Sequence, residues 1–307
     1  MRAGGLMAGL AVALAVVPAA AASQLIDRNA SRVRLVADAH GHALLTYRAH
    51  GRIRRVEAWG ALNARLPSQN IPQVKFRLSY VGGTVHNTCR RYDGPALAWL
   101  VQACKAGDGS YLAVQSWQRL LPNAGYHPWL ASQTAWELRL SHWRGPLARL
   151  EVYEDWVYGG RFHELFGRLT YKGAAVHGFH TTSRGAALDG YGRNLSLDTY
   201  DSAYGSGWHR ENSFVAHNPS GMWCYGFVPY SRYPGYPHQR NAKLTGSGLK
   251  YRITVSGPGV TPDVMWMGAG LPDFNANNPE LSSWESQMNA ELDAMATRYG
   301  ERLCRHH

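Results

Sequence analysis

The sequence predicts a mainly β protein whose antiparallel sheets form a sandwich or a barrel. Apolar and polar side chains alternate over residues 74–80 and again over residues 136–141, which is the period of two that half-buried strands show. Short glycine-containing turns, such as His50-Gly51 and Arg144-Gly145-Pro146, separate runs of this kind. Turns of this length cannot hold the crossover that a parallel pair needs, so neighbouring strands are expected to be antiparallel.

The strands are expected in two meanders. The first occupies residues 31–82, could form a subdomain, and contains strands near 33–35, 44–47, 53–59 and 74–80. The second contains strands near 136–141, 150–156 and 165–171, and a further strand is expected over 251–255. Residues 111–121 fit a strand or a helix, and we favour a strand for their first half.

Two helices are expected beside the sheets. The first is inserted at about residues 94–105, where Asp93 can cap it, Pro95 lies in its first turn, and apolar residues recur at helical spacing up to Cys104. The second covers about residues 279–303, is capped by Asn278, and carries a continuous apolar stripe.

Residues 1–22 are expected to form a secretion signal. They begin with Met1-Arg2, continue as a run of Ala, Leu, Val and Gly, and end in a block of alanines at Ala22. A retained membrane anchor is the alternative, but the run is short and its alanines are weakly apolar. No later run of 18 apolar residues occurs, so we expect residues 23–307 to form one strand-rich globular domain, secreted or at the cell envelope, without a transmembrane segment.

The cysteines are expected to form two disulfides. An even number of cysteines in an exported chain favours disulfides over metal ligands or free thiols. Three pairings are possible, and we predict Cys89 with Cys104 and Cys224 with Cys304.

The chain is strongly basic, with a formal net charge of +11, which indicates an anionic neighbour. Arginine greatly outnumbers lysine, and no run of five or six like charges occurs, so no nucleic-acid partner is expected. The stretch from Arg32 to Arg55 is locally basic, and we predict that Arg52, Arg54 and Arg55 bind an anionic polymer. The alternative is a solvated sheet face with evenly spread charge.

Acids and aromatic residues gather in the second meander, which suggests carbohydrate binding or chemistry. Two carboxylates on either side of a sugar ring can act as acid and base or nucleophile, and aromatic rings can stack on sugars. The candidates are Glu151, Glu154 and Asp155 for catalysis, and Trp143, Trp156 and Tyr158 for binding. The alternative is structural, because strand-rich domains bury aromatic residues and place acids on the wet face.

A third arrangement involves His177-Gly178 and, further along, Cys224 within a serine- and glycine-containing stretch. It partly resembles the L,D-transpeptidases, exported β-fold enzymes that crosslink peptidoglycan through a cysteine thiolate. Their signature is Ser-His-Gly-Cys-x-Arg, and this chain lacks the histidine before Cys224 and the arginine after it. A nucleophilic Cys224 would also leave three cysteines for disulfides.

These observations give two functional hypotheses. The first is a secreted or cell-envelope protein that binds a polysaccharide or an anionic cell-wall polymer. The second is an extracellular hydrolase or transferase that acts on glycans or peptidoglycan. We expect neither a metal nor a cofactor, and no phosphate-binding loop, dinucleotide fingerprint or G-x-S-x-G motif occurs.

Overall fold

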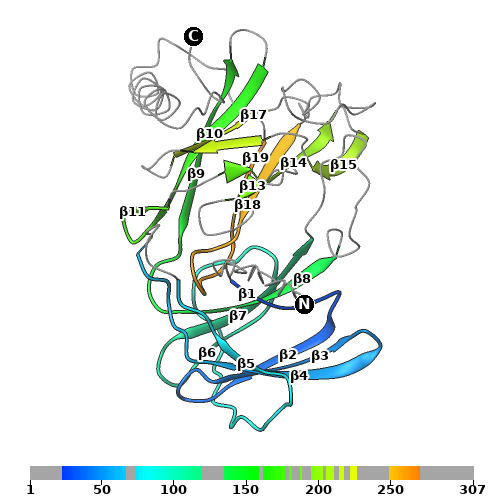
Figure 1. The fold of residues 1–307 in the computed structure, drawn as a ribbon, viewed down its shortest axis with the longest axis vertical. Helices are drawn as coiled ribbons and strands as arrows, with labels where there is room; N and C mark the ends of the chain where they lie inside the picture. The colour runs from blue at the N-terminus through cyan, green and yellow to red at the C-terminus, as the bar shows by residue number, and fades with distance from the viewer. Residues whose placement is uncertain are drawn as a thin grey trace, which may run out of the picture.

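The computed structural model describes residues 23–66, 73–118, 135–158, 162–176, 180–181, 187–188, 195–202, 205–210, 214–217, 222–226 and 249–269. These residues form strands and their connections, and none of them lies in a helix (Figure 1). The mainly β, antiparallel class is therefore confirmed. The secretion signal over 1–22 and the C-terminal helix over 279–303 lie outside the described residues.

The first meander forms one sheet, and its strands pair in sequence order. The strands are β2 (Ser31–Ala37), β3 (Ala43–Ala49), β4 (Arg52–Trp59) and β5 (Arg77–Ser79). The β2–β3 turn is closed by Asp38, whose carboxylate accepts hydrogen bonds from the backbone N–H groups of His40 and His42 at 2.8 and 2.9 Å. The β3–β4 turn places His50 and Gly51 at φ of 51° and 74°, as a two-residue hairpin turn of the I′ kind requires.

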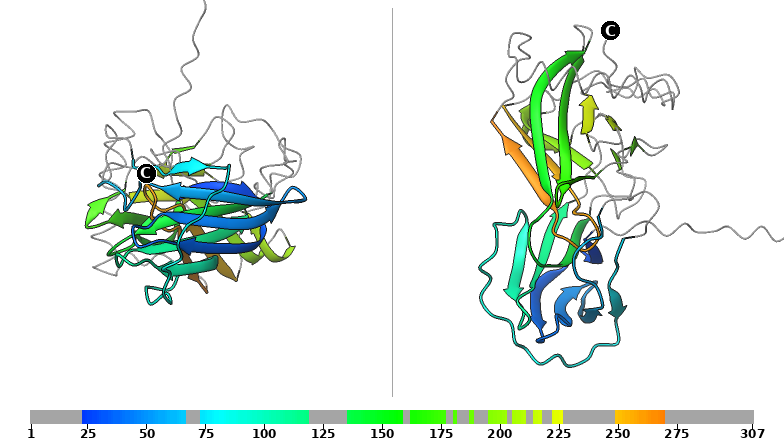
Figure 2. Two further views of the ribbon diagram at one scale, coloured as in Figure 1. Left: turned by 90° about the horizontal axis from the view of Figure 1, so that it is seen from below. Right: turned by 90° about the vertical axis from the view of Figure 1, so that its left-hand side faces the viewer.

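A second sheet packs against the first to form an N-terminal sandwich (Figure 2). Its order is β1 (Gln24–Arg28), β8 (Trp136–Trp143), β7 (Tyr111–Gln118) and β6 (Leu100–Lys105). Alternate residues of both sheets are buried between them, among them Leu35, Leu45, Val56, Leu112 and Leu140. The predicted meander over residues 31–82 thus shares its core with a partner sheet.

The side chain of Gln102 joins the two sheets at one edge. Its amide oxygen accepts from the backbone N–H of Leu35 at 2.8 Å, and its amide nitrogen donates to the carbonyl of Leu35 at 3.3 Å. The side chain therefore takes the hydrogen bonds that a neighbouring strand would have taken on β2.

The prediction of an inserted helix at about residues 94–105 is wrong. Leu100–Lys105 form strand β6, which pairs with β7, and Leu100 and Val101 are exposed where a helix would have buried them. Apolar residues at spacings of three and four over so short a segment fit either structure. Pairing with β7 and the crosslink at Cys104 decide in favour of the strand.

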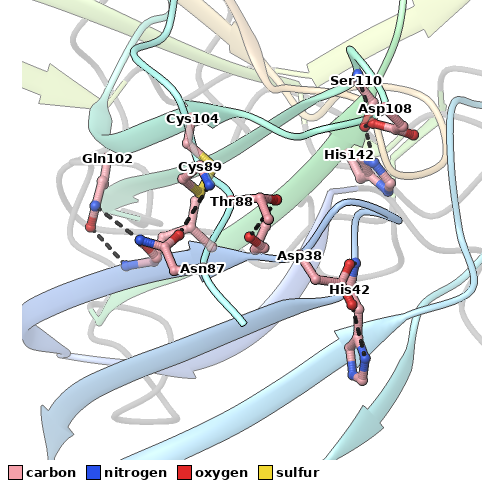
Figure 3. Close-up of a disulfide and its surroundings, with 12 residues drawn as sticks. Asp38, His42, Asn87, Thr88, Cys89, Gln102, Cys104, Asp108, Ser110 and His142 are labelled. Carbon is pink, nitrogen blue, oxygen red and sulfur yellow. Dashed lines mark hydrogen bonds and ion pairs between the residues drawn. A yellow bond between two sulfur atoms is a disulfide. The ribbon is translucent and has the colours of Figure 1, made fainter. Parts of the chain in front are cut away.

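The predicted disulfide between Cys89 and Cys104 is confirmed, with 5.4 Å between the Cα atoms. It ties the segment before β6 to β6 itself (Figure 3). Cys224 lies on β17, of which only the backbone is described, and Cys304 lies outside the described residues, so their pairing stays a prediction.

The C-terminal half contains two larger sheets and a short pair of strands. One sheet comprises β9 (Arg149–Tyr158), β10 (Phe162–Tyr171), β11 (Ala174–Ala175), β16 (Phe214–His217) and β17 (Met222–Gly226). The other has the order β15 (Gly205–Arg210), β14 (Leu195–Ser202), β18 (Lys250–Val255) and β19 (Val264–Gly268). The short pair is β12 (His180–Thr181) with β13 (Ala187–Leu188). Leu169, Tyr171, Leu197, Ile253 and Val255 are buried in a second core.

A buried polar joint connects the two halves. The carboxylate of Asp263, which is 2% exposed, accepts hydrogen bonds from Trp117 Nε1 at 2.7 Å, Gly257 N at 3.1 Å and the hydroxyl of Ser23. The backbone N–H of Asp263 donates to Gln115 Oε1 at 2.8 Å. A carboxylate with this many donors is stable inside the protein, so the joint fixes the loop before β19 to β7.

Candidate anion-binding face

Strands β2, β3 and β4 carry six arginines near the turn that joins β3 to β4. All six are exposed: Arg32, Arg34, Arg48, Arg52, Arg54 and Arg55. Partners in antiparallel register project to the same side of a sheet. The pairs Arg48 with Ile53 and Arg55 with Thr46 therefore lie on the outer side, away from the sandwich core.

The three arginines predicted from the sequence do not share one side of the sheet. Arg54 is the register partner of Tyr47 and Arg52 that of Ala49, and both partners belong to the core-facing side. Arg55 lies on the opposite side, and one of its terminal nitrogens donates to the carbonyl of Gly83 at 2.5 Å. We define the arginine face as the outer group of Arg32, Arg34, Arg48 and Arg55.

Arg32 reaches this face through an irregularity in β2. The register with β3 shifts between Ser31 and Arg34, and Arg32 adopts φ of 52°, in the left-handed region that non-glycine residues rarely occupy. A β-bulge of this kind inserts one residue and redirects its side chain. The sequence suggests nothing of this bulge, because its residues alternate as in a regular strand.

A hollow of about 390 Å³ lies beside Arg32 and Arg48. Its lining is completed by Thr46, Tyr47, Gly51 and Ile53. The side chain of Ile53 is 76% exposed, which is unusual for a large apolar residue. The hollow therefore combines two guanidinium groups with a hydroxyl and an apolar wall.

The six arginines form no ion pair with any carboxylate among the described residues. Arginines elsewhere in those residues do: Arg139 pairs with Glu137 at 2.6 Å, and Arg252 pairs with Asp198 at 2.7 Å. A guanidinium presents five donors in a planar fork that matches carboxylates and phosphates. Apart from the bond that Arg55 donates to the Gly83 carbonyl, the side chains of the arginine face thus offer donors that no carboxylate of the described residues takes up.

One acid lies near the end of the β3–β4 hairpin, and it is bound to a histidine. The carboxylate of Asp27 on β1 is 3.1 Å from Nε2 of His50. Burial opposes ionisation of Asp27, but hydrogen bonds from the Arg28 N–H and from His50 outweigh it and lower the pKa of the carboxyl. Burial, reinforced by Asp27, raises the pKa of Tyr47.

A buried serine and histidine of the N-terminal sandwich resemble a nucleophile and its base (Figure 3). The hydroxyl of Ser110 lies 2.8 Å from Nε2 of His142 and 2.6 Å from the carboxylate of Asp108, and Nδ1 of His142 contacts the carbonyl of Ala61 at 2.6 Å. In a catalytic triad the acid binds the histidine, whereas here it binds the serine. Ser110 is 0% and His142 4% exposed, so the chain of contacts is structural.

The ionisation states of His142 and Asp108 follow from their surroundings. Burial lowers the pKa of His142, against the opposing effects of the Ala61 carbonyl and the charge of Asp108. Burial raises the pKa of Asp108, but hydrogen bonds from Ser110 and the charge of Arg144 outweigh it, so that pKa is lowered overall. The ring is therefore held neutral beside an ionised carboxylate.

The acids predicted to be catalytic are spread along β9. Glu151 forms an ion pair with Arg149 at 2.7 Å. The backbone of Asp155 pairs with Leu165, and Glu154 lies where the register between β9 and β10 shifts. The side chains of Glu154 and Asp155 lie outside what the structure describes, so their catalytic role stays a prediction.

The residues predicted to stack on sugars are Trp143, which is buried, and two residues of β9. Trp143 is 0% exposed, with its ring centroid 5.5 Å from that of Tyr111 and 6.2 Å from that of Tyr92, so its faces are not open to a ligand. Trp156 and Tyr158 lie on β9 at positions for which only the backbone is described. Two aromatic residues that the sequence did not single out, Tyr200 and Trp208, are half-buried register partners on β14 and β15.

No group of three or more histidine, cysteine, aspartate or glutamate residues that could hold a metal occurs within the described ranges. His177 lies outside those ranges, and for Cys224 only the backbone is described. No described helix is long and apolar enough to cross a membrane. Comparisons with protein-family models, curated proteins and solved structures find no match to this chain.

Proposed function

We propose that this protein binds an acidic polysaccharide or another anionic cell-wall polymer through the arginine face, outside the cytoplasm. The observation that carries the proposal is the hollow beside Arg32 and Arg48, flanked by guanidinium groups without a carboxylate partner among the described residues. Polymers of this class repeat carboxylate or phosphate groups along their length. Each such group can accept two hydrogen bonds from one guanidinium.

Several weak contacts along a polymer suit a flat sheet better than one deep pocket does. Exposed ion pairs contribute only about 0–1 kcal/mol each, and salt screens them. Binding by four arginines is therefore expected to be of moderate affinity and strongly dependent on ionic strength. Ile53 adds an apolar contact that salt does not weaken.

The test compares two double variants of equal charge. Arg32→Glu with Arg48→Glu reverses the charge beside the hollow, whereas Arg90→Glu with Arg91→Glu reverses two exposed arginines beside the disulfide. On immobilised polygalacturonate, the first variant is expected to elute at much lower salt than the wild type, and the second close to it. Equal shifts in both variants would show that only net charge matters and would refute the assignment of the face.

A triple variant tests whether the polymer also contacts the other side of the hairpin. Arg52→Ala, Arg54→Ala and Arg55→Ala together remove two guanidiniums from the core-facing side and one from the outer side. We expect a smaller shift in elution than for the Arg32 and Arg48 pair. A larger shift in elution than for that pair would show that the main contact lies at the end of the β3–β4 hairpin.

The extracytoplasmic location has its own test. It is supported by the Cys89–Cys104 disulfide and by the composition of residues 1–22. N-terminal sequencing of the exported protein is expected to begin at about Ser23, and thiol titration of the unfolded, unreduced protein is expected to find no free thiol. An unprocessed chain with four reactive thiols would refute the location.

A further inference from the structure

The C-terminal half carries an aromatic surface on the outer side of the β15-β14-β18-β19 sheet. Tyr200 on β14 is the register partner of Trp208 on β15 and of Lys250 on β18, so these three side chains form one row across the sheet. In the next row, Asp198 is paired with Arg252, and Arg252 with Met267 on β19. We call Tyr200, Trp208, Lys250, Arg252 and Met267 the aromatic face.

The position of Arg252 is fixed by three neighbours. Its guanidinium carbon lies 4.3 Å from the ring centre of Trp208 and 4.6 Å from that of Trp99, and its nitrogens donate to Asp198 Oδ2 at 2.7 and 3.1 Å. Asp198 is 2% exposed and projects to the same side of the sheet as Arg252, so a buried acid neutralises Arg252. Trp99 reaches it from the N-terminal half, with φ of 58°, a costly conformation for a bulky residue.

The rings of the aromatic face remain open to solvent in part. Tyr200 and Trp208 are half-buried, with their ring centres 5.1 Å apart, and Nζ of Lys250 lies 5.5 Å from the ring centre of Tyr200. Met267 is 57% exposed at the edge of the same face. An anchored, partly exposed group of large apolar side chains is typical of a binding surface.

The charge of this surface indicates the class of ligand. Arg252 is neutralised by Asp198, and the exposed Lys250 has the opposite charge to the exposed Asp201 nearby on β14. The charges of the side chains described on this surface thus balance, unlike those of the arginine face, and these side chains offer little attraction to a polyanion. Its complement is a flat, uncharged ligand with an apolar side and hydroxyl groups at the rim, which is the shape of a pyranose ring.

We propose that the aromatic face binds a neutral sugar ring, stacked on Trp208 and Tyr200, with Met267 at its edge. Aromatic side chains provide large and rigid apolar contact areas, and the phenol of Tyr200 and the ammonium of Lys250 can donate to sugar hydroxyls. This site is separate from the arginine face in position and in chemistry. It does not depend on the function proposed for that face.

The experiment measures binding of neutral tetrasaccharides of glucose, N-acetylglucosamine, mannose or xylose by tryptophan fluorescence and calorimetry. At least one is expected to bind the wild type with an affinity that hardly changes between 0.05 and 0.5 M salt. Trp208→Ala is expected to weaken it at least tenfold and Trp208→Phe much less. Trp136→Ala, which removes a 46% exposed tryptophan on β8, serves as the matched control and should bind normally.

A second variant separates binding from folding, because Trp208 also contacts Arg252. Met267→Asp changes only an exposed side chain, so it should unfold at the wild-type temperature and bind the sugar at least threefold more weakly. The Arg32→Glu, Arg48→Glu variant should bind the sugar normally while its binding to polygalacturonate is weakened. Each proposal can therefore be refuted without the other. Absence of binding to all four sugars at 10 mM, or unchanged binding in both Trp208→Ala and Met267→Asp, would overturn the proposal.

Discussion

Arg32 and Arg48 in the N-terminal half have surroundings opposite to those of Arg252 in the C-terminal half. In the N-terminal sandwich, Arg32 and Arg48 flank a hollow and have no carboxylate partner among the described residues. In the C-terminal half, Arg252 lies between two indole rings and a buried carboxylate. The first arrangement leaves donors free for an anion, and the second makes an arginine part of the packing.

This difference follows from what lies on the neighbouring strands. The register partners of Arg48 are Ser31 and Ile53, neither of which can neutralise a charge. The register partner of Arg252 on β14 is Asp198, and cross-strand pairs of opposite charge stabilise a sheet. Arginine side chains therefore contribute to a charged surface in one sheet and to a surface with paired charges in the other.

The largest effect is expected from removal of the acid that pairs with Arg252. Asp198→Ala leaves a guanidinium that is 14% exposed without its carboxylate, and breaking a buried pair in this way costs about 3–5 kcal/mol. Chemical denaturation should report this loss, and Met267→Ala, at an exposed residue of the same sheet, should stay close to the wild type. A loss below about 1 kcal/mol would mean that Arg252 is not part of the packing.

The next effect concerns the N-terminal half alone. Replacement of Cys89 and Cys104 by serine removes a crosslink between residues 15 apart, which corresponds to about 3 kcal/mol in the chain-entropy account. The free energy of unfolding should fall by about this amount when both proteins are measured without reductant, so that the predicted Cys224–Cys304 crosslink is kept in both. Sugar binding at the aromatic face should persist below the unfolding transition, because the crosslink lies in the other half.

The sequence predicts a strand well where its pattern is local. Alternation over residues 136–141 needs only the chain itself, and the turn at His50-Gly51 is determined by two residues. Of residues 74–80 only Arg77–Ser79 form a strand, and strands β14 to β17 were not predicted. Strand β6 was missed because its structure depends on β7 and on Cys89, both distant from its own pattern. Local periodicity cannot decide a segment of this kind.

The candidate sites were harder to predict than the strands. The basic stretch was visible, but the grouping of Arg32 with Arg48 depends on a bulge, and Arg52 and Arg54 project to the other side. Trp208 and Arg252 come together only when β15 and β18 flank β14. One signal was available. Residues 198 and 200 stand two apart in one segment and residues 250 and 252 in another, so each pair is expected to face the same side of its strand.

A smaller effect is expected from pH, through His142 in the N-terminal half. Burial lowers the pKa of this ring below its ordinary value of about 6.5, so as pH falls below that value the unfolded chain binds a proton that the native chain resists. The groups around the ring are Asp108, Arg144, Ser110, the Ala61 carbonyl and the stacked ring of Phe76.

The free energy of unfolding should therefore decrease from pH 7 to pH 5, with a limiting slope of about 1.4 kcal/mol per pH unit. The lowered pKa of Asp108 adds its own loss only at lower pH, near the ordinary range of carboxyl groups. Denaturant titrations at several pH values should show a shallower slope in His142→Gln. His86→Gln, at an exposed histidine, should keep the wild-type slope.

The smallest effect on stability is expected at the arginine face, which sharpens the contrast with Arg252. Arg48→Ala removes an exposed guanidinium without a carboxylate partner among the described residues, so the free energy of unfolding should change by no more than about 0.5 kcal/mol. The same variant should elute from polygalacturonate at lower salt. A large loss of stability would mean that Arg48, like Arg252, is part of the packing of the fold.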